Sequence, residues 1–228
     1  MTDKENNLTV NLALLKELAN RNIRHNVSKK IESIVESLYD RQDYAHYHYH
    51  TFKNIISKVD TDLAKFKMAF NMSDDDIRNK TAIQANIFAC MQSIHITHDI
   101  LAYLIATILN LELSEREITF QKVQKKVNIF ENLKNLMNAF SNHDDYRYLI
   151  SYVNHAKHRY HIEPKITYYF VGEKHHTAEF EEFEFKGNQY QKQNVEEFLF
   201  REYNREQKLI LQIENELINI LQIDQGQN

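Results

Sequence analysis

The chain has 228 residues with a formal net charge of −4, 43% hydrophobic residues, three glycines and one proline. This composition can bury a core in one large domain, and it excludes strand-rich and loop-rich folds, which need more Gly and Pro at their turns. The acidic balance argues against a general polyanion binder but leaves a local basic pocket open. Cys90 is the single cysteine. An intramolecular disulfide is therefore excluded, and a reducing, cytoplasmic location is expected.

Long helices are predicted over the first half of the chain. Residues 10–70 are almost free of Gly and Pro and carry apolar residues at helical spacing, which indicates one or two helices. Ser73 and the three aspartates that follow it mark the start of another long helix, which we expect to run to about Leu111. The apolar stretch of this helix is interrupted by four polar residues: Gln92, His95, His98 and Asp99. A buried helix is therefore expected, and no membrane span.

The second half begins with more helix. Ser114 and Glu117 form a capping-box pattern for a helix that is predicted to continue to about residue 141. Residues 142–145 break it, and a short helix is predicted from Tyr146 to about His158, with Pro164 preventing its continuation.

The apolar pattern then changes period. Alternating apolar residues on both sides of Gly172 predict a β-hairpin over 165–190, and Asn194 resembles the cap of a last amphipathic helix. The predicted fold class is mainly α: a helical bundle with one β-hairpin inserted before the C-terminal helix. We expect a single domain over 1–228, with residues 1–10 flexible and 224–228 as a tail.

The segment with the most evident chemistry combines an amide, cations and histidines within a few residues, namely Asn154, His155, Lys157, His158 and Arg159. A histidine beside two cations can act as a general acid or base while the cations hold a phosphate, which are the parts that metal-independent RNA cleavage needs. The alternative is structural, because cations in the last turn of a helix also complement its dipole.

His95 and Asp99 form a second group. Their spacing of four places them on one face of a helix, where Asp99 could orient His95 or a histidine from another helix. A buried polar pair that fixes helix register explains the same spacing. His98 lies in the apolar seam and is expected to be a core residue.

The Tyr- and His-rich segment 44–50 offers a third group. His46 and His50 are helical neighbours that could bind zinc, but no third ligand is evident, so a packing or interface surface is favoured. Cys90 lies in an apolar segment and is expected to be a small core residue. The sequence contains no glycine-rich phosphate loop, and no metal or cofactor is predicted.

A resemblance extends over roughly Gln84 to Leu221. The string from Tyr148 to Arg159, Tyr-Leu-Ile-Ser-Tyr-Val-Asn-His-Ala-Lys-His-Arg, resembles the Asn-x-x-Lys-His-Arg segment of an uncharacterised group of bacterial helical proteins. The helix with His95 and Asp99, the hairpin residues 180–190 and the helix from Val195 are similar to further segments of that group.

That group looks related to the HEPN superfamily of helical bundles. Many HEPN proteins are RNases that act as dimers, often in toxin–antitoxin or phage-defence systems, and their hallmark is Arg followed by His after four to six residues. Here Arg147 and His155 have seven residues between them, and Arg41 and His46 have four but lie in the first long helix. The resemblance therefore implies the fold more directly than the activity.

Two hypotheses of function follow. In the first, a HEPN-like homodimer binds RNA or cleaves it as a metal-independent endoribonuclease, in a toxin or defence system. The residues assigned to the site are His158 as acid or base, Lys157 and Arg159 on phosphate, Asn154 as orienting group, and His95 with Asp99 in support. In the second, a non-catalytic helical interaction protein uses the same cluster structurally. A small-molecule or nucleotide pocket with the same cations is a weaker third hypothesis.

Overall fold

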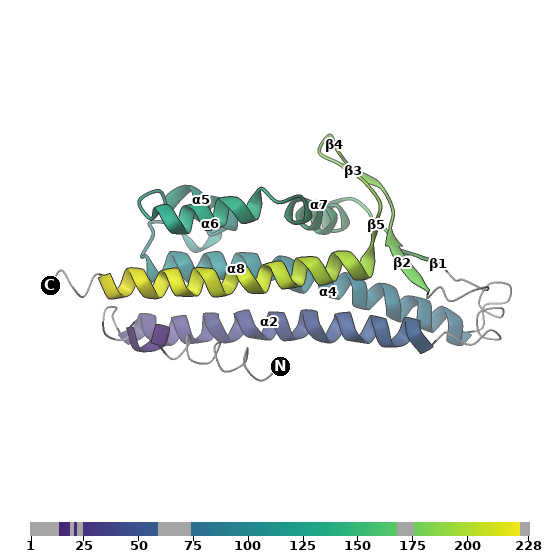
Figure 1. Cartoon of the computed structure of the whole chain (residues 1–228), viewed down its shortest axis with the longest axis horizontal. Coiled ribbons are helices and arrows are strands. Elements are labelled where there is room, and N and C mark those ends of the chain that lie inside the picture. The colour runs from purple at the N-terminus through teal and green to yellow at the C-terminus, as the bar shows by residue number, and fades with distance from the viewer. Residues whose placement is uncertain (1–13, 19–20, 22–24, 59–73, 168–175, 224–228) are drawn as a thin grey trace. The chain divides into compact units, whose positions relative to one another are not determined.

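The computed structural model describes residues 14–18, 21, 25–58, 74–167 and 176–223 (Figure 1). This part of the chain is mainly helical, with a small antiparallel β-structure before the last helix, and the predicted fold class is confirmed at that level. The longest elements are α2 (His25–Lys58), α4 (Asp74–Ile108), α7 (Asp144–His158) and α8 (Val195–Ile223). The predicted flexible start at 1–10 and tail at 224–228 lie outside the described residues.

The two long helices of the first half form where the apolar spacing predicts them. The apolar seam of α4 is buried from Ile83 to Ile108. The helix ends where Asn110 adopts a left-handed φ of 47° and the Leu111 amide reaches back to the Ala106 carbonyl at 3.0 Å. Among the described helices, none combines the length and the apolar character that crossing a lipid bilayer requires.

The segment after α4 corrects one prediction. The expected continuous helix to about residue 141 is instead three pieces, η1 (Glu115–Glu117), α5 (Phe120–Lys126) and α6 (Glu131–Ser141). The Thr119 side chain accepts from the Lys122 amide at 3.3 Å and starts α5, and the Asn128 amide donates to the Lys125 carbonyl at 2.8 Å beyond its end. These side chains satisfy backbone groups that a continuous helix would use, while the apolar spacing gives no sign of the breaks.

The β-structure before α8 has more strands than the single predicted hairpin. β1 (Lys165–Thr167), β2 (Thr177–Phe180) and β5 (Gln193–Asn194) form an antiparallel sheet in the order β1-β2-β5. β3 (Phe183–Phe185) and β4 (Asn188–Tyr190) form a separate hairpin. Lys186 and Gly187 both have positive φ, which matches the two-residue turn that twisted hairpins prefer. Residues 168–175, which include the predicted turn at Gly172, lie outside the described residues.

The last helix starts at the predicted cap. The Asn194 side chain accepts from the Glu197 amide at 3.0 Å, and β5 leads directly into α8 (Figure 1). Helix α8 is amphipathic as predicted, but its buried face also carries Glu202, Glu206 and Glu214.

The chain divides into two compact units. The first comprises residues 1–42, 96–143 and 205–228, and the second comprises 43–95 and 144–204. The single domain over 1–228 remains a prediction. The second unit has a core of aliphatic and aromatic side chains from α2, α4, α7, the strands and α8, centred on Tyr152, Phe180 and Phe198. Cys90 belongs to this core, as predicted.

The first unit buries polar groups in its core. His98 and Glu206 are almost fully buried, with His98 Nε2 3.2 Å from Glu206 Oε1, and His98 contacts the rings of Phe120 and Phe140. Buried polar groups are costly unless they are paired, so this contact fits the expected core role of His98.

Candidate functional site

The last turn of α7 presents the predicted cluster to solvent. The side chains of Lys157, His158 and Arg159 are exposed and that of Asn154 is half-buried. The Arg159 amide still bonds to the His155 carbonyl at 2.8 Å, so these side chains are held on a helical backbone. The side chains of Lys157, His158 and Arg159 make no hydrogen bond to another described residue.

His155 fixes the chain just beyond the helix. Its ring is 3% exposed, and Nδ1 donates to the Tyr160 carbonyl at 3.1 Å. The same ring packs edge-on against the Tyr160 ring at 4.5 Å, and on its other sides it contacts Phe183 and Phe185. His155 is therefore a structural residue that orients Tyr160.

Two further contacts hold the segment after Tyr160. The Tyr152 hydroxyl donates to the Ile162 carbonyl at 2.6 Å, and the His161 ring packs edge-on against Phe88 of α4 at 5.2 Å. Tyr160 nevertheless remains 70% exposed. We name Lys157, His158, Arg159, Tyr160 and His161 the α7-end cluster. It combines positive charge with an exposed aromatic ring whose backbone is fixed.

His95 lies beside this cluster and is electrostatically coupled to it. Burial, together with a smaller effect of the positive charge of Lys157, lowers the pKa of His95 to about 4. The ring is 9% exposed. His95 is therefore neutral at pH 7, where it cannot supply a proton as an imidazolium.

The structure brings together five of the six predicted site residues within the second unit. Asn154, Lys157 and His158 lie on α7, Arg159 follows its last residue, and the charge of Lys157 acts on His95. Asp99 is exposed and belongs to the first unit, and its support of His95 remains a prediction.

The nearest described carboxylate on the same segment is already engaged. Glu163 Oε2 accepts from Gln84 Nε2 at 3.3 Å and lies 3.7 Å from Lys80 Nζ. Its charge is thus offset by a cation on α4, and the α7-end cluster keeps a local excess of positive charge. Lys157 lies in the last turn of α7, where the structural alternative expects a cation to complement the helix dipole.

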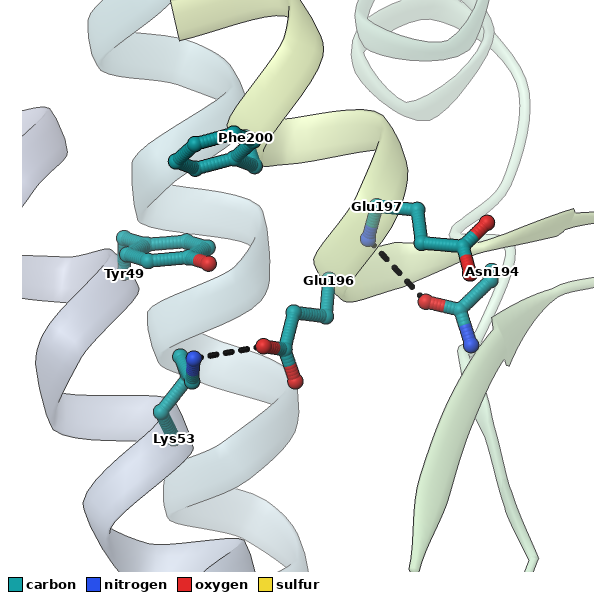
Figure 2. Close-up of a pocket in the computed structure, with 6 residues that line it drawn as sticks. All are labelled: Tyr49, Lys53, Asn194, Glu196, Glu197 and Phe200. Atoms are coloured by element: carbon teal, nitrogen blue, oxygen red, sulfur yellow. Dashed lines mark hydrogen bonds and ion pairs between the residues drawn. The ribbon is translucent and has the colours of Figure 1, made fainter.

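A separate hollow of about 390 Å³ lies at the start of α8 (Figure 2). It is lined by Tyr49, Lys53, Asn194, Glu196, Glu197 and Phe200. Lys53 Nζ lies 2.5 Å from Glu196 Oε1, and this carboxylate raises the pKa of Lys53. The hollow shares no residue with the α7-end cluster, and its most prominent charges neutralise each other.

Sequence reasoning missed the contribution of Tyr160. An aromatic residue directly after a run of cations is the available signal, but its exposure depends on the His155 contact that only the structure supplies. Comparison with protein-family models, curated proteins and solved structures finds no significant match to this chain. The resemblance to HEPN proteins therefore remains a prediction.

Proposed function

We propose that this protein binds single-stranded RNA through the α7-end cluster. The observation that carries the proposal is an exposed aromatic ring, Tyr160, which His155 orients beside the exposed cations Lys157 and Arg159. Phosphates are attracted to such cations, and an unpaired base can stack on the ring.

Single-stranded RNA fits this surface better than a duplex does. Bases in a duplex are stacked on one another, whereas those of a single strand are free to stack on aromatic side chains. The cluster has only two permanently charged side chains in a chain of net charge −4. Binding is therefore expected to be local and to depend on stacking as well as on charge.

Cleavage is the second function that we propose for the same surface. His158 lies between Lys157 and Arg159 in the sequence and is exposed, so it is open to a ribose hydroxyl or a leaving oxygen. Histidine is the side chain best suited to proton transfer near neutral pH. The resemblance to HEPN ribonucleases supports this role and a setting in toxin or defence systems. His95, as a neutral group, would act by positioning.

The binding proposal is tested by titrating the purified full chain into fluorescently labelled single-stranded RNA. Tyr160→Ala should weaken binding by about 1–3 kcal/mol, which is the usual contribution of one stacked base, whereas Tyr160→Phe should retain it. Lys157→Gln and Arg159→Gln should each reduce the slope of log K against log salt by about 0.7.

Arg147→Gln is the matched control for charge. Arg147 is also exposed on α7, but it lies near Asp144 at 3.8 Å and outside the α7-end cluster. It should leave both the affinity and the salt slope unchanged. Equal losses in Arg147→Gln and Arg159→Gln, or no RNA binding by the unmodified chain, would reject the proposal and favour the interaction-protein hypothesis.

Cleavage is tested separately, in the presence of EDTA. His158→Ala should abolish cleavage and keep the helical circular dichroism, while RNA binding persists through Tyr160 and the cations. If His158→Ala cleaves as fast as the unmodified chain, the catalytic assignment is wrong and the binding proposal stands on its own test.

A further inference from the structure

His46 and His50 form a pair of neighbouring imidazoles on α2. They are one helical turn apart, both side chains are exposed, and their ring centroids lie 4.2 Å from each other. Neither residue belongs to the α7-end cluster or to the proposed RNA-binding surface.

Two histidines at this spacing present their ring nitrogens to the same point above a helix. The spacing is used in zinc enzymes, where two histidines four residues apart on one helix face hold the metal. Because the helix already fixes both backbone positions, only the side-chain rotamers must adjust when an ion binds. The rings are close enough for such an adjustment to be small.

Charged and aromatic side chains from α2 and α8 surround the histidine pair. Lys53 is the cation that faces His50, and Glu196 of α8 lies 2.5 Å from its ammonium nitrogen. Tyr203 of α8 faces His46 with its ring centroid 6.2 Å away, and Tyr49 contacts His50 edge-on at 5.2 Å. The cation that would oppose a metal is thus paired with a carboxylate.

We propose that His46 and His50 bind one divalent transition-metal ion of the copper, nickel and zinc class. Imidazole is a preferred ligand of these ions, and Cu²⁺ is expected to bind most tightly. Within the described residues no group of three or more potential ligands is assembled. The remaining coordination positions therefore belong to water, and the ion is exchangeable, unlike a closed structural zinc.

The experiment is a titration of the full, untagged chain with Cu²⁺, followed by electron paramagnetic resonance, with Zn²⁺ in a parallel calorimetric titration. One equivalent should bind with a spectrum that reports nitrogen ligands. His46→Ala and His50→Ala should each weaken this binding at least tenfold, and the double variant should abolish it.

His48→Ala is the matched control. His48 lies on the same helix within the same run, but its Nδ1 is 2.8 Å from Asn86 Oδ1 of α4. This variant should bind copper like the unmodified chain. Full binding in the double variant, or equal loss in His48→Ala, would overturn the proposal.

A second readout does not depend on spectroscopy. Since the two nitrogens converge only when the helix is formed, metal should raise the melting temperature of the unmodified chain and of His48→Ala. The rise should disappear in His46→Ala and His50→Ala. If both variants keep the same rise, the ion binds elsewhere and the proposal fails.

Discussion

His95 shows how burial sets the role of a single side chain. Its folded pKa of about 4 lies below the ordinary value of 6.5, so the folded chain favours the neutral ring. Its contribution to stability is present above about pH 6.5 and is lost as the pH falls toward 4. At neutral pH the ring can accept a hydrogen bond or position a neighbour without adding charge to the cluster.

The coupling between His95 and Lys157 is open to direct measurement. Lys157→Met keeps the aliphatic stem and removes the charge, so the pKa of His95 should rise, although burial should keep it below 6.5. The shift can be followed by NMR titration of the imidazole. Lys165→Met, on β1, should leave the His95 pKa unchanged. An unshifted pKa in Lys157→Met would show that the two side chains are not neighbours.

In the first unit, burial shifts the pKa of Glu214 upward, whereas it shifts that of His95 downward. Burial raises its pKa from 4.5 to about 7, although the hydrogen bond from the Tyr39 hydroxyl, at 2.9 Å, favours the ionised form. The folded state therefore holds a proton that the unfolded state releases between about pH 4.5 and 7. The contribution of Glu214 to stability is full below that window and falls as the pH rises through it.

Glu214→Gln should remove this dependence. The amide mimics the protonated carboxyl, so above pH 7 the variant should be more stable than the unmodified chain by up to about 3 kcal/mol, and near pH 4.5 the difference should vanish. Urea unfolding at the two pH values measures it. Glu216→Gln, two residues along α8, is the control. A constant difference at both pH values would mean that Glu214 does not titrate in this window.

At the scale of elements, the end of α7 is tied to the chain that follows it by buried hydroxyl and ring contacts. Tyr148 and Tyr152 are both buried in the same core, but only Tyr152 has a partner for its hydroxyl, the Ile162 carbonyl. The Tyr148 hydroxyl has no hydrogen-bond partner among the described residues. Substitution of each tyrosine by Phe therefore compares the loss of a bonded hydroxyl with the loss of an unbonded one in the same core.

Tyr152→Phe should lower the free energy of unfolding by about 1–3 kcal/mol, because it leaves the Ile162 carbonyl without its donor. Tyr148→Phe removes a hydroxyl that is buried without a partner and should be neutral or stabilising. Thermal and urea unfolding compare the two variants. The proposed account of the α7 end would be wrong if Tyr148→Phe proved the more damaging change.

The elements differ in how far the sequence predicts them. Helices α2, α4 and α8 follow from apolar residues at helical spacing and, for α8, from the cap at Asn194, which acts over a few neighbouring residues. The strand pairing does not follow in this way. Ile166 pairs with Ala178 and Phe183 with Tyr190, and these registers depend on a chain that changes sheets at Glu181 and Glu182.

In the candidate site, too, the features that are local in sequence could be predicted and those that depend on tertiary packing could not. The cations of the α7-end cluster are local in sequence, so their shared helix end could be predicted. The burial of His95 beside Lys157 and the exposure of Tyr160 depend on packing between α4, α7 and the strands, which periodicity does not encode. The predicted link between His95 and Asp99 rests on helical spacing alone and stays a prediction.

At the scale of the whole molecule, charge limits how RNA could be held. The chain is acidic overall, so phosphate would be repelled from much of the surface and attracted only to local cationic patches. One cluster with two permanent cations provides a short contact. Two copies of the chain would double that contact, which agrees with the dimers implied by the resemblance to HEPN proteins.

We therefore predict a homodimer. Light scattering coupled to size exclusion should give twice the chain mass of 27.3 kDa. Affinity for RNA should fall on dilution if both clusters are used together. A mass of one chain at every concentration would confine RNA binding to a single α7-end cluster and remove the HEPN-like assembly from the proposal.

The buried thiol of Cys90 makes the opening of the second unit measurable. Cys90 is 1% exposed, packs in the core of the second unit and donates to the Ala45 carbonyl at 3.3 Å. A thiol reagent can reach Cys90 only when that core opens. The rate at which Cys90 is labelled in the native protein therefore measures how often the second unit opens. Comparing this rate with global unfolding would reveal whether the unit with the α7-end cluster opens alone, with no substitution introduced.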